Sequence, residues 1–263
     1  MVQILRKISR ILLLDRIRTI VEWVGDLGRL IASTALRLPH LPGNLDITVY
    51  QMYSIGVQSI PLVLIVSLFT GAVACSQAAM QFQGIVPLTY LGTATAKVTF
   101  IELGPVITAL VLSGRVGASI AAELGTMKTN EQIDAMECLS LEPLRYLVLP
   151  RIVAGTVMYV ILTIIALFVA LIGGWITAVA VVDITSHLYL SGLKFLFSIA
   201  DVRLGLIKAG VFGFITTSVG CYFGINAEGG AEGVGKAAMG SVVATAVLVL
   251  ILDFVIVALF LKV

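Results

Sequence analysis

The stretch that decides the fold is Ile152–Val182, IVAGTVMYVILTIIALFVALIGGWITAVAVV, which contains no Asp, Glu, Lys or Arg. A helix satisfies its own backbone polar groups, so about 20 apolar residues are enough to cross roughly 30 Å of hydrocarbon. This run exceeds that length. It predicts a transmembrane helix and hence an integral membrane protein.

The composition of the whole chain agrees with this interpretation. Of its 263 residues, 59% are hydrophobic and only 12% are charged, and the mean hydropathy is +1.08. An average globular chain is less apolar and carries about 25% charged residues. We therefore exclude a soluble domain and expect an all-α integral membrane protein.

The length criterion yields five transmembrane helices, at about 54–80, 88–125, 147–180, 204–225 and 238–261. They belong to one transmembrane domain, residues 46–263, which follows an N-terminal segment of residues 1–45. The second span contains Glu102, Pro105 and Arg115, so we expect it to be kinked or broken near Gly104-Pro105.

The N-terminal segment has a different pattern. Apolar residues recur at helical spacing through residues 3–37, with charges between them, and seven of the first 37 residues are Lys or Arg. This pattern predicts an amphipathic helix that lies in the membrane interface. The alternative is an amphipathic helix docked on the protein's own core.

The distribution of basic residues predicts the orientation. Lys and Arg near a membrane are enriched on the cytoplasmic side, and here they favour the N-terminus and the segment 126–146. With five spans, the N-terminus is then cytoplasmic and the C-terminus lies on the opposite, periplasmic side.

A short polar helix is predicted at about residues 130–139, between the second and third spans. Thr129 or Asn130 can cap it, Glu131 to Asp134 form an acidic first turn, and Pro143 closes the segment. Such a helix is either a docking element or an ordinary connection.

Ionisable residues inside a span are costly and mark cavities or protein interfaces. Glu102 is the best functional candidate, and the alternative is a structural carboxylate paired with Arg115 or Lys97. Arg115 and Glu123 favour structural pairing across helices. Asp253 is compatible with either role.

No catalytic centre is visible. Gly230–Ala237, GAEGVGKA, resembles a phosphate-binding loop but has Ala237 where magnesium requires Ser or Thr, so we interpret it as a flexible glycine-rich turn. His40 and His187 have no partners at metal-ligand spacing. We expect no enzyme and no metal site, and an energy source in another subunit or an ion gradient.

A GxxxG pattern, Gly220 to Gly224, predicts a close helix contact, either within one subunit or between two.

Several motifs together resemble the MlaE/YrbE family of ABC-transporter permeases, from about Tyr50 to Leu261. They are SIPLV at 59–63, FTGAV at 69–73, ELGPV at 102–106, GRVGAS at 114–119, AELGTMK at 122–128, EQIDAM at 131–136, Pro150-Arg151 and LDF at 252–254.

The resemblance implies a permease subunit of the bacterial inner membrane that moves phospholipids or related lipids. It implies a homodimer flanked by two cytoplasmic ATPase subunits, which bind ATP and Mg, and capped outside by MCE proteins. A small STAS-type accessory protein is a further expected partner. No cofactor in this chain and no nucleic acid are implied.

The resemblance also implies site residues. The helix at 130–139 would be the coupling helix that contacts the ATPase, through Glu131, Gln132, Asp134, Ala135 and Met136. Lipid would bind at the dimer interface between the first span and the start of the second, through Gln77, Phe82, Glu102 and Leu103. Family members can have a basic residue directly before this glutamate, but Ile101 stands there, so a local cation for a headgroup is not implied.

Two other functions remain open from the residues alone. One is an ion-coupled secondary carrier with Glu102 and Asp253 as proton sites, and the other is a membrane scaffold that transports nothing.

Overall fold

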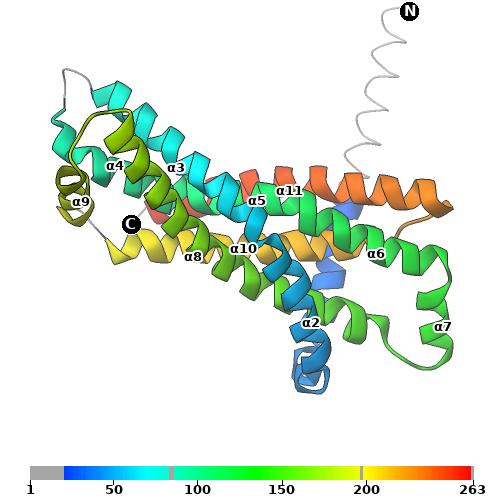
Figure 1. Ribbon diagram of the computed structural model, residues 1–263. Coiled ribbons are helices and arrows are strands. Elements are labelled where there is room, and N and C mark those ends of the chain that lie inside the picture. Colours follow the sequence, from blue (N-terminus) through cyan, green and yellow to red (C-terminus); the bar gives the residue numbers. More distant parts are fainter. Residues whose placement is uncertain (1–20, 83–85, 196–197, 262–263) are drawn as a thin grey trace, which may run out of the picture.

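A computed structural model describes residues 21–82, 86–195 and 198–261 (Figure 1). These residues form helices and connections, with no strand among them. The expected all-α architecture is therefore confirmed. The amphipathic helix predicted through residues 3–37 lies outside the described part up to residue 20.

The helices follow one another with short connections. The first described helix covers residues 21–35, and the α-helices after it are α2 Leu45–Ile55, α3 Ile60–Phe82, α4 Leu91–Val98, α5 Gly104–Leu112, α6 Ala118–Thr129, α7 Gln132–Cys138, α8 Leu149–Ala180, α9 Ser186–Phe195, α10 Ile199–Ile225 and α11 Gly230–Leu261. Three π-helical turns are η4 Thr99–Leu103, η5 Ser113–Gly117 and η6 Leu144–Val148, and three 3₁₀ turns are η1 Leu38–Asn44, η2 Val57–Ser59 and η3 Leu88–Tyr90.

Five helical segments are long and apolar enough to cross a membrane. They are Leu38–Phe82, Leu88–Thr129, Leu144–Ala180, Ile199–Ile225 and Gly230–Phe260. This confirms the predicted number of spans. In Figure 1 the long helices run side by side, with α7 at one end of the bundle and α9 with the start of α4 at the other.

The second span is not broken near Gly104-Pro105. Helical structure continues from Leu91 to Thr129, and the π turn η4 lies directly before Gly104-Pro105. A π turn inserts one extra residue into a helix, and such turns are frequent at functional sites. The irregularity predicted at this proline is thus a π turn, after which the α-helix resumes at Gly104.

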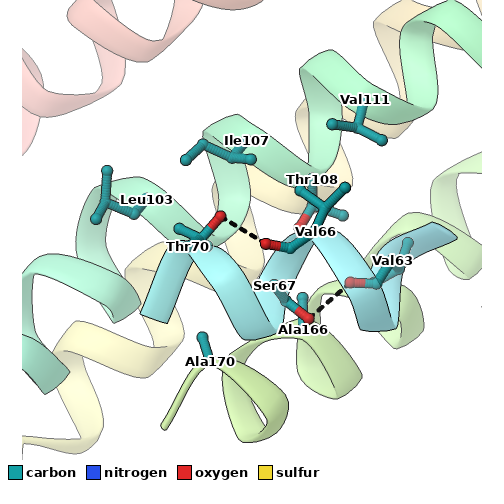
Figure 2. A pocket seen from close by; sticks show the side chains of 11 residues that line it. Val63, Val66, Ser67, Thr70, Leu103, Ile107, Thr108, Val111, Ala166 and Ala170 are labelled. Carbon is teal, nitrogen blue, oxygen red and sulfur yellow. Dashed lines mark hydrogen bonds between the residues drawn. The ribbon is translucent and has the colours of Figure 1, made fainter. Parts of the chain in front are cut away.

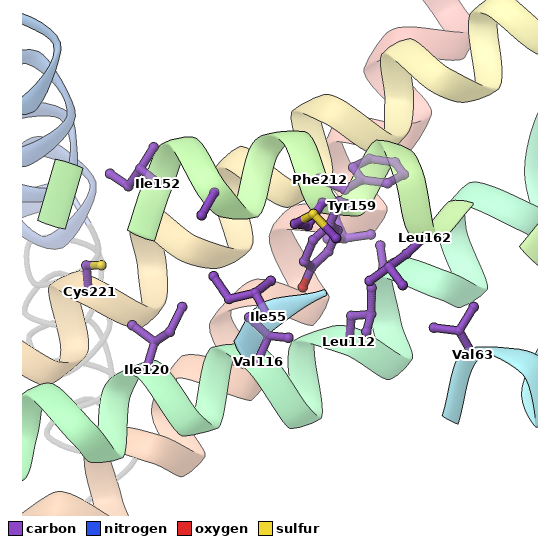
Figure 3. Close-up of a cluster of buried hydrophobic side chains, with 14 of the residues drawn as sticks. Ile55, Val63, Leu112, Val116, Ile120, Ile152, Tyr159, Leu162, Phe212 and Cys221 are labelled. Carbon is purple, nitrogen blue, oxygen red and sulfur yellow. The ribbon is translucent and has the colours of Figure 1, made fainter. Parts of the chain in front are cut away.

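One large apolar core lies between α5, α6, α8 and α10 (Figure 3). Tyr159 and Phe212 are fully buried in it, together with Leu112, Leu162 and Ile120. The core holds the bundle together along most of its length.

Glycines bring α3 and α8 into direct backbone contact. A Cβ added at Gly71 would overlap the backbone of Ala170, and one added at Gly173 would overlap the backbone of Leu68. Small residues allow this approach in membrane helices. Any larger side chain at either position would push the two helices apart.

The GxxxG pattern of α10 packs inside the chain. A Cβ at Gly224 would lie 2.6 Å from Cβ of Leu124, and one at Gly220 would lie 3.1 Å from the carbonyl oxygen of Gly117. The pattern therefore joins α10 to η5 and α6.

Helix α11 turns large apolar side chains outward. Phe254 is 74% exposed, and Val243, Val247, Leu250 and Leu259 are more than half exposed. In water such a surface would be unfavourable, whereas lipid or another apolar surface accommodates it.

The prediction of a flexible turn at Gly230–Ala237 is wrong. These residues form the first turns of α11, and Lys236 Nζ lies 2.7 Å from Glu232 Oε1 at i,i+4 spacing. A shorter turn leads into α11, with Gly229 and Gly230 at positive φ angles of 91° and 66°. A side-chain pair one helical turn apart supports the helix despite its glycines.

The N-terminal helix, residues 21–35, is docked on the bundle by one face. Trp23 packs edge-on against Tyr222, with ring centroids 6.2 Å apart, and Leu27 and Thr34 are buried. Val21, on the same helix, is exposed. This part of the helix therefore contacts the bundle along one face, and its predicted position in the membrane interface stays a prediction.

Candidate functional site

A large apolar groove lies between α3 and the α4–α5 side of the second span. Its volume is about 660 Å³, in the range of small-molecule sites. The lining residues are mostly aliphatic or aromatic: Ile65, Val66, Phe69, Thr70, Val73, Ala74, Gln77, Ala78, Gln81, Ala94, Thr95, Val98, Leu103 and Ile107.

Two hydroxyl groups, that of Thr70 in the groove and that of Ser67 beside it, are satisfied locally. Figure 2 shows the adjoining small cavity between α3, α5 and α8, where Thr70 and Ser67 donate to carbonyl oxygens of their own helix. These bonds are 2.8 Å to Val66 and 2.6 Å to Val63. Their hydroxyls thus add little polarity, so the groove suits hydrocarbon.

The structure separates the four residues predicted to contact lipid. Gln77 and Leu103 line the groove. Phe82 is half-buried in a separate cluster around Leu91, and Glu102 turns toward α10.

Glu102 belongs to a buried ion cluster. Lys208 of α10 is fully buried, and its Nζ lies 2.9 Å from Glu102 Oε1 and 2.7 Å from Asp253 Oδ1. It also donates to the carbonyl oxygen of Ile101 at 3.0 Å. The contacts with Glu102 and Ile101 are hydrogen bonds, whereas the contact with Asp253 is an ion pair without hydrogen-bond geometry.

Pro105 explains why the carbonyl of Ile101 is available. Proline has no N–H, so the carbonyl four residues earlier loses its helical partner. Gly205 lets α10 approach at this point, since a Cβ there would overlap the carbonyl oxygen of Phe100 and lie 3.3 Å from Cγ of Pro105. The lysine therefore compensates both the carboxylates and the freed carbonyl.

The partners predicted for Glu102 are wrong. Lys97 Nζ lies 3.8 Å from Asp201 Oδ2 instead. Arg115 donates hydrogen bonds to Ser59 and Gln58. Sequence reasoning missed Lys208, although a lysine inside the fourth predicted span was a signal. The rotation of α10 that aims it at Glu102 is not visible in the sequence.

A second ion pair crosses between helices nearer to α7. Arg151 is almost fully buried, and its Nη2 lies 2.6 Å from Glu123 Oε1. Its Nη1 donates to the carbonyl oxygen of Leu147 at 2.7 Å. This confirms the structural pairing expected for Glu123.

Helix α7 occupies the predicted 130–139 segment and presents most of its surface. Ile133 is buried and anchors it, whereas Glu131, Gln132, Asp134 and Ala135 are exposed and Met136 is half-buried.

The capping predicted for α7 is wrong. Thr129 donates to Thr126, and Glu131 precedes the helix in a left-handed conformation with φ 57°. Ser140, just after the helix, is also left-handed, with φ 61°.

The connection after α7 is tied to the N-terminal segment. Arg37 Nε donates to Glu142 Oε2 at 2.8 Å, and Asn44 Nδ2 donates to the carbonyl oxygen of Arg145 at 3.1 Å. The Arg37 guanidinium lowers the pKa of the exposed Glu142 carboxyl. These two bonds join the connection after α7 to the residues that link the N-terminal helix with α2.

Within residues 21–82, 86–195 and 198–261, no three His, Cys, Asp or Glu side chains are placed to hold a metal ion.

Comparison with known proteins identifies the relatives of this architecture. Residues 48–259 match the family described as permease MlaE. A probable ABC transporter permease protein of Rickettsia felis is 39% identical over 84% of this chain and 86% of its own length. Similar proteins occur in Synechocystis, 37% identical over 79% of each chain, and in the alga Pyropia yezoensis, 34% identical over 86% of each. The chain belongs to the MlaE family of ABC-transporter permeases.

Proposed function

We propose that this permease moves phospholipids or related lipids between the bacterial inner membrane and an MCE protein, driven by separate ATPase subunits. The observation that carries the lipid assignment is the 660 Å³ groove with its aliphatic lining. Burying one acyl methylene contributes about 0.8 kcal/mol. Acyl chains therefore gain affinity from such a surface without specific polar contacts.

The two glutamines of the groove supply its exposed polar groups. Gln77 and Gln81 both lie at the end of α3 away from α7. Their amides can donate to the ester or phosphate oxygens of a headgroup while the tails lie along Val73 and Phe69. Few fixed polar contacts favour a loose selectivity among lipids.

Filling the groove tests the lipid assignment. Ala74→Trp places a large ring in the groove, and Ile164→Trp makes the same kind of change on the exposed side of α8, outside the groove. We expect Ala74→Trp to reduce both copurified lipid and ATP-driven lipid transport in proteoliposomes, with Ile164→Trp close to wild type. Normal transport by Ala74→Trp would contradict the assignment.

The ATPase is proposed to dock on α7. The exposed carboxylate of Asp134 lies 2.7 Å from Lys128 Nζ, on a helix with a buried anchor and an open polar face. Asp134→Arg or Met136→Arg should abolish capture of the ATPase subunit in a pull-down. Glu232→Arg is the matched control, because that carboxylate also pairs with a lysine, at 2.7 Å, and lies toward the same end of the bundle.

The remaining partners and the orientation are part of the proposal. Two copies would meet through outward apolar surfaces such as that of α11, with the N-terminus cytoplasmic and the C-terminus periplasmic. A STAS-type accessory protein could join on the ATPase side. Cysteine labelling from each side of the membrane, for instance at the exposed Cys138, tests the orientation.

The ion-coupled carrier is a distinguishable alternative. Glu102 and Asp253 share Lys208 in the buried cluster, which gives both carboxylates a structural role. Transport that continues without ATP but stops with an uncoupler would favour the carrier. A scaffold would show neither kind of transport.

A further inference from the structure

Two polar stripes face each other between the α7 end of the bundle and its middle. Gln51, Ser54 and Gln58 lie on α2 and η2, and Arg115, Ser119 and Glu123 lie on η5 and α6. Both sets recur at three- and four-residue spacing, so each forms one helix face. The cavity between them, which we name the Arg115 cleft, has a volume of about 60 Å³.

The guanidinium of Arg115 keeps unused hydrogen-bonding capacity. Of its five N–H donors, one reaches the hydroxyl of Ser59 and one reaches Gln58 Oε1 at 3.3 Å. Across the described residues, no carboxylate lies within 4.0 Å of it as an ion-pair partner. Glu123 also lines the cleft, but its Oε1 accepts from Arg151 at 2.6 Å.

The cleft lies close to the depth where the apolar part of α11 begins. Ser241 Oγ of α11 donates to the carbonyl oxygen of Gly117 at 3.2 Å, which places Arg115 near the level of Ser241. The last charged residue before it on α11 is the exposed Lys236, on the order of 8 Å away along the axis. At this depth, the Arg115 cleft is within reach of the lipid headgroups of one leaflet.

We propose that the Arg115 cleft binds a phosphate group, supplied by a phospholipid headgroup of the leaflet on the α7 side. Arginine matches phosphate oxygens with a planar fork of donors, and amide and hydroxyl groups complete the contacts. One water needs roughly 10–15 Å³, so the cleft of about 60 Å³ has room for a small oxyanion in place of several waters.

The cleft is separate from the groove of the proposed function, and the two share no lining residue. A phosphate site here would hold lipid on the α7 side before or after its passage through the groove. The inference extends the proposed lipid transport, but its test measures binding alone. Either proposal can therefore fail while the other stands.

A photocrosslinking experiment tests the cleft in the full chain. The unmodified chain is irradiated in vesicles of phosphatidylglycerol or of digalactosyldiacylglycerol, which contains no phosphate, each with a diazirine on its headgroup, and adducts are counted on the peptides that contain Gln51, Ser54 or Ser119. We expect a lipid adduct by mass spectrometry only with phosphatidylglycerol. Arg115→Gln should reduce it at least about tenfold, because charge-assisted bonds are lost. Lys236→Gln removes the same charge at the same end and should leave it unchanged.

Free phosphate is separated from the lipid headgroup by a second arm. If inorganic phosphate binds the delipidated chain in calorimetry, requires Arg115, and no lipid adduct forms, the site is assigned to free phosphate. Ser119→Leu fills the cleft without removing Arg115 and should weaken either ligand, which covers the case that Arg115→Gln does not fold. Equal adducts in wild type, Arg115→Gln and Ser119→Leu, without phosphate binding, would overturn the proposal.

Discussion

The two π turns of the second span carry charges of opposite sign and end in different environments. At η4, Glu102 meets the buried Lys208, which also holds Asp253. At η5, Arg115 meets only the neutral Ser59 and Gln58. A π turn thus carries a carboxylate that is paired with a lysine at η4, and an arginine that has no carboxylate partner among the described residues at η5.

The difference shows that the neighbouring helix decides what a charge in a membrane span does. Helix α10 supplies an ammonium to η4, so the charges there hold helices together. The α2 side supplies hydroxyl and amide groups to η5, so donors remain for a ligand. Lys208 beside η4 is fully buried, whereas Arg115 at η5 is half-buried, so the cost of removing the cation should be larger for Lys208.

The largest expected effect is that of Lys208→Met. The substitution leaves Asp253, 19% exposed, and Glu102, 38% exposed, without their cation. Breaking a buried pair costs about 3–5 kcal/mol, and the partial exposure of Glu102 places the expected cost toward the lower end. We expect a corresponding loss in the free energy of unfolding in detergent. Lys194→Met, at an exposed lysine of α9, is the control and should change little.

Removing the carboxylates as well should restore part of this stability. The triple variant Lys208→Met, Glu102→Gln, Asp253→Asn no longer contains a buried unpaired charge. A triple variant no more stable than Lys208→Met alone would show that the cluster does not act through charge.

Glu123→Gln should have an intermediate effect. It leaves the buried Arg151 guanidinium without its carboxylate, but Glu123 itself is half-exposed, so solvent screens part of the loss. We expect about 2 kcal/mol of destabilisation in the same unfolding measurement. Glu228→Gln, at an exposed glutamate, serves as control. A loss in the free energy of unfolding as large as that of Lys208→Met would contradict the proposed relation between the burial of an ion pair and the stability lost when it is broken.

Arg115→Met should cost less, about 1 kcal/mol, since two hydrogen bonds to neutral partners are lost. The hydroxyl of Ser59 remains satisfied, because it donates to the carbonyl oxygen of Ile55 at 2.6 Å. Arg203→Met, at an exposed arginine of α10, is the control in thermal unfolding. A loss comparable to that of Lys208→Met would mean that Arg115 is a structural cation.

The smallest effect belongs to the exposed pair of Arg37 and Glu142. Because Arg37 lowers the pKa of Glu142, this contact contributes at and above the ordinary glutamate pKa, about 4.3. It is lost as pH falls through the lowered pKa. Trp23 fluorescence in a Trp175→Phe background should therefore report loosening of the N-terminal helix only at acidic pH, and Glu142→Gln should remove that dependence. A transition near neutral pH would contradict it.

The spans could be predicted from sequence because membrane insertion depends on local hydropathy. Uncharged runs such as Ile152–Val182 define their helices without reference to neighbours. The irregularity at Pro105 was also predictable, since it follows from a missing N–H. Helix α11 was predicted too short, because Gly230–Ala237 has the composition of a turn and its helical start depends on the preceding tight turn.

The candidate site was less predictable, because it depends on how helices face each other. Glu102 and Asp253 were recognised as unusual, but their common partner Lys208 was not, since pairing depends on the rotation of α10. Gln77 and Leu103 lie in the groove, whereas Phe82 lies one cluster away. These positions followed from family resemblance, not from a physical rule.

The glycine contacts between α3 and α8 limit how the groove can change its width. With Gly71 against Ala170 and Gly173 against Leu68, these two helices have no intervening side chains that could repack. We therefore expect α3 and α8 to move as one rigid body during transport. The groove would then open and narrow through movement of the second span, which can bend at the extra residue of η4.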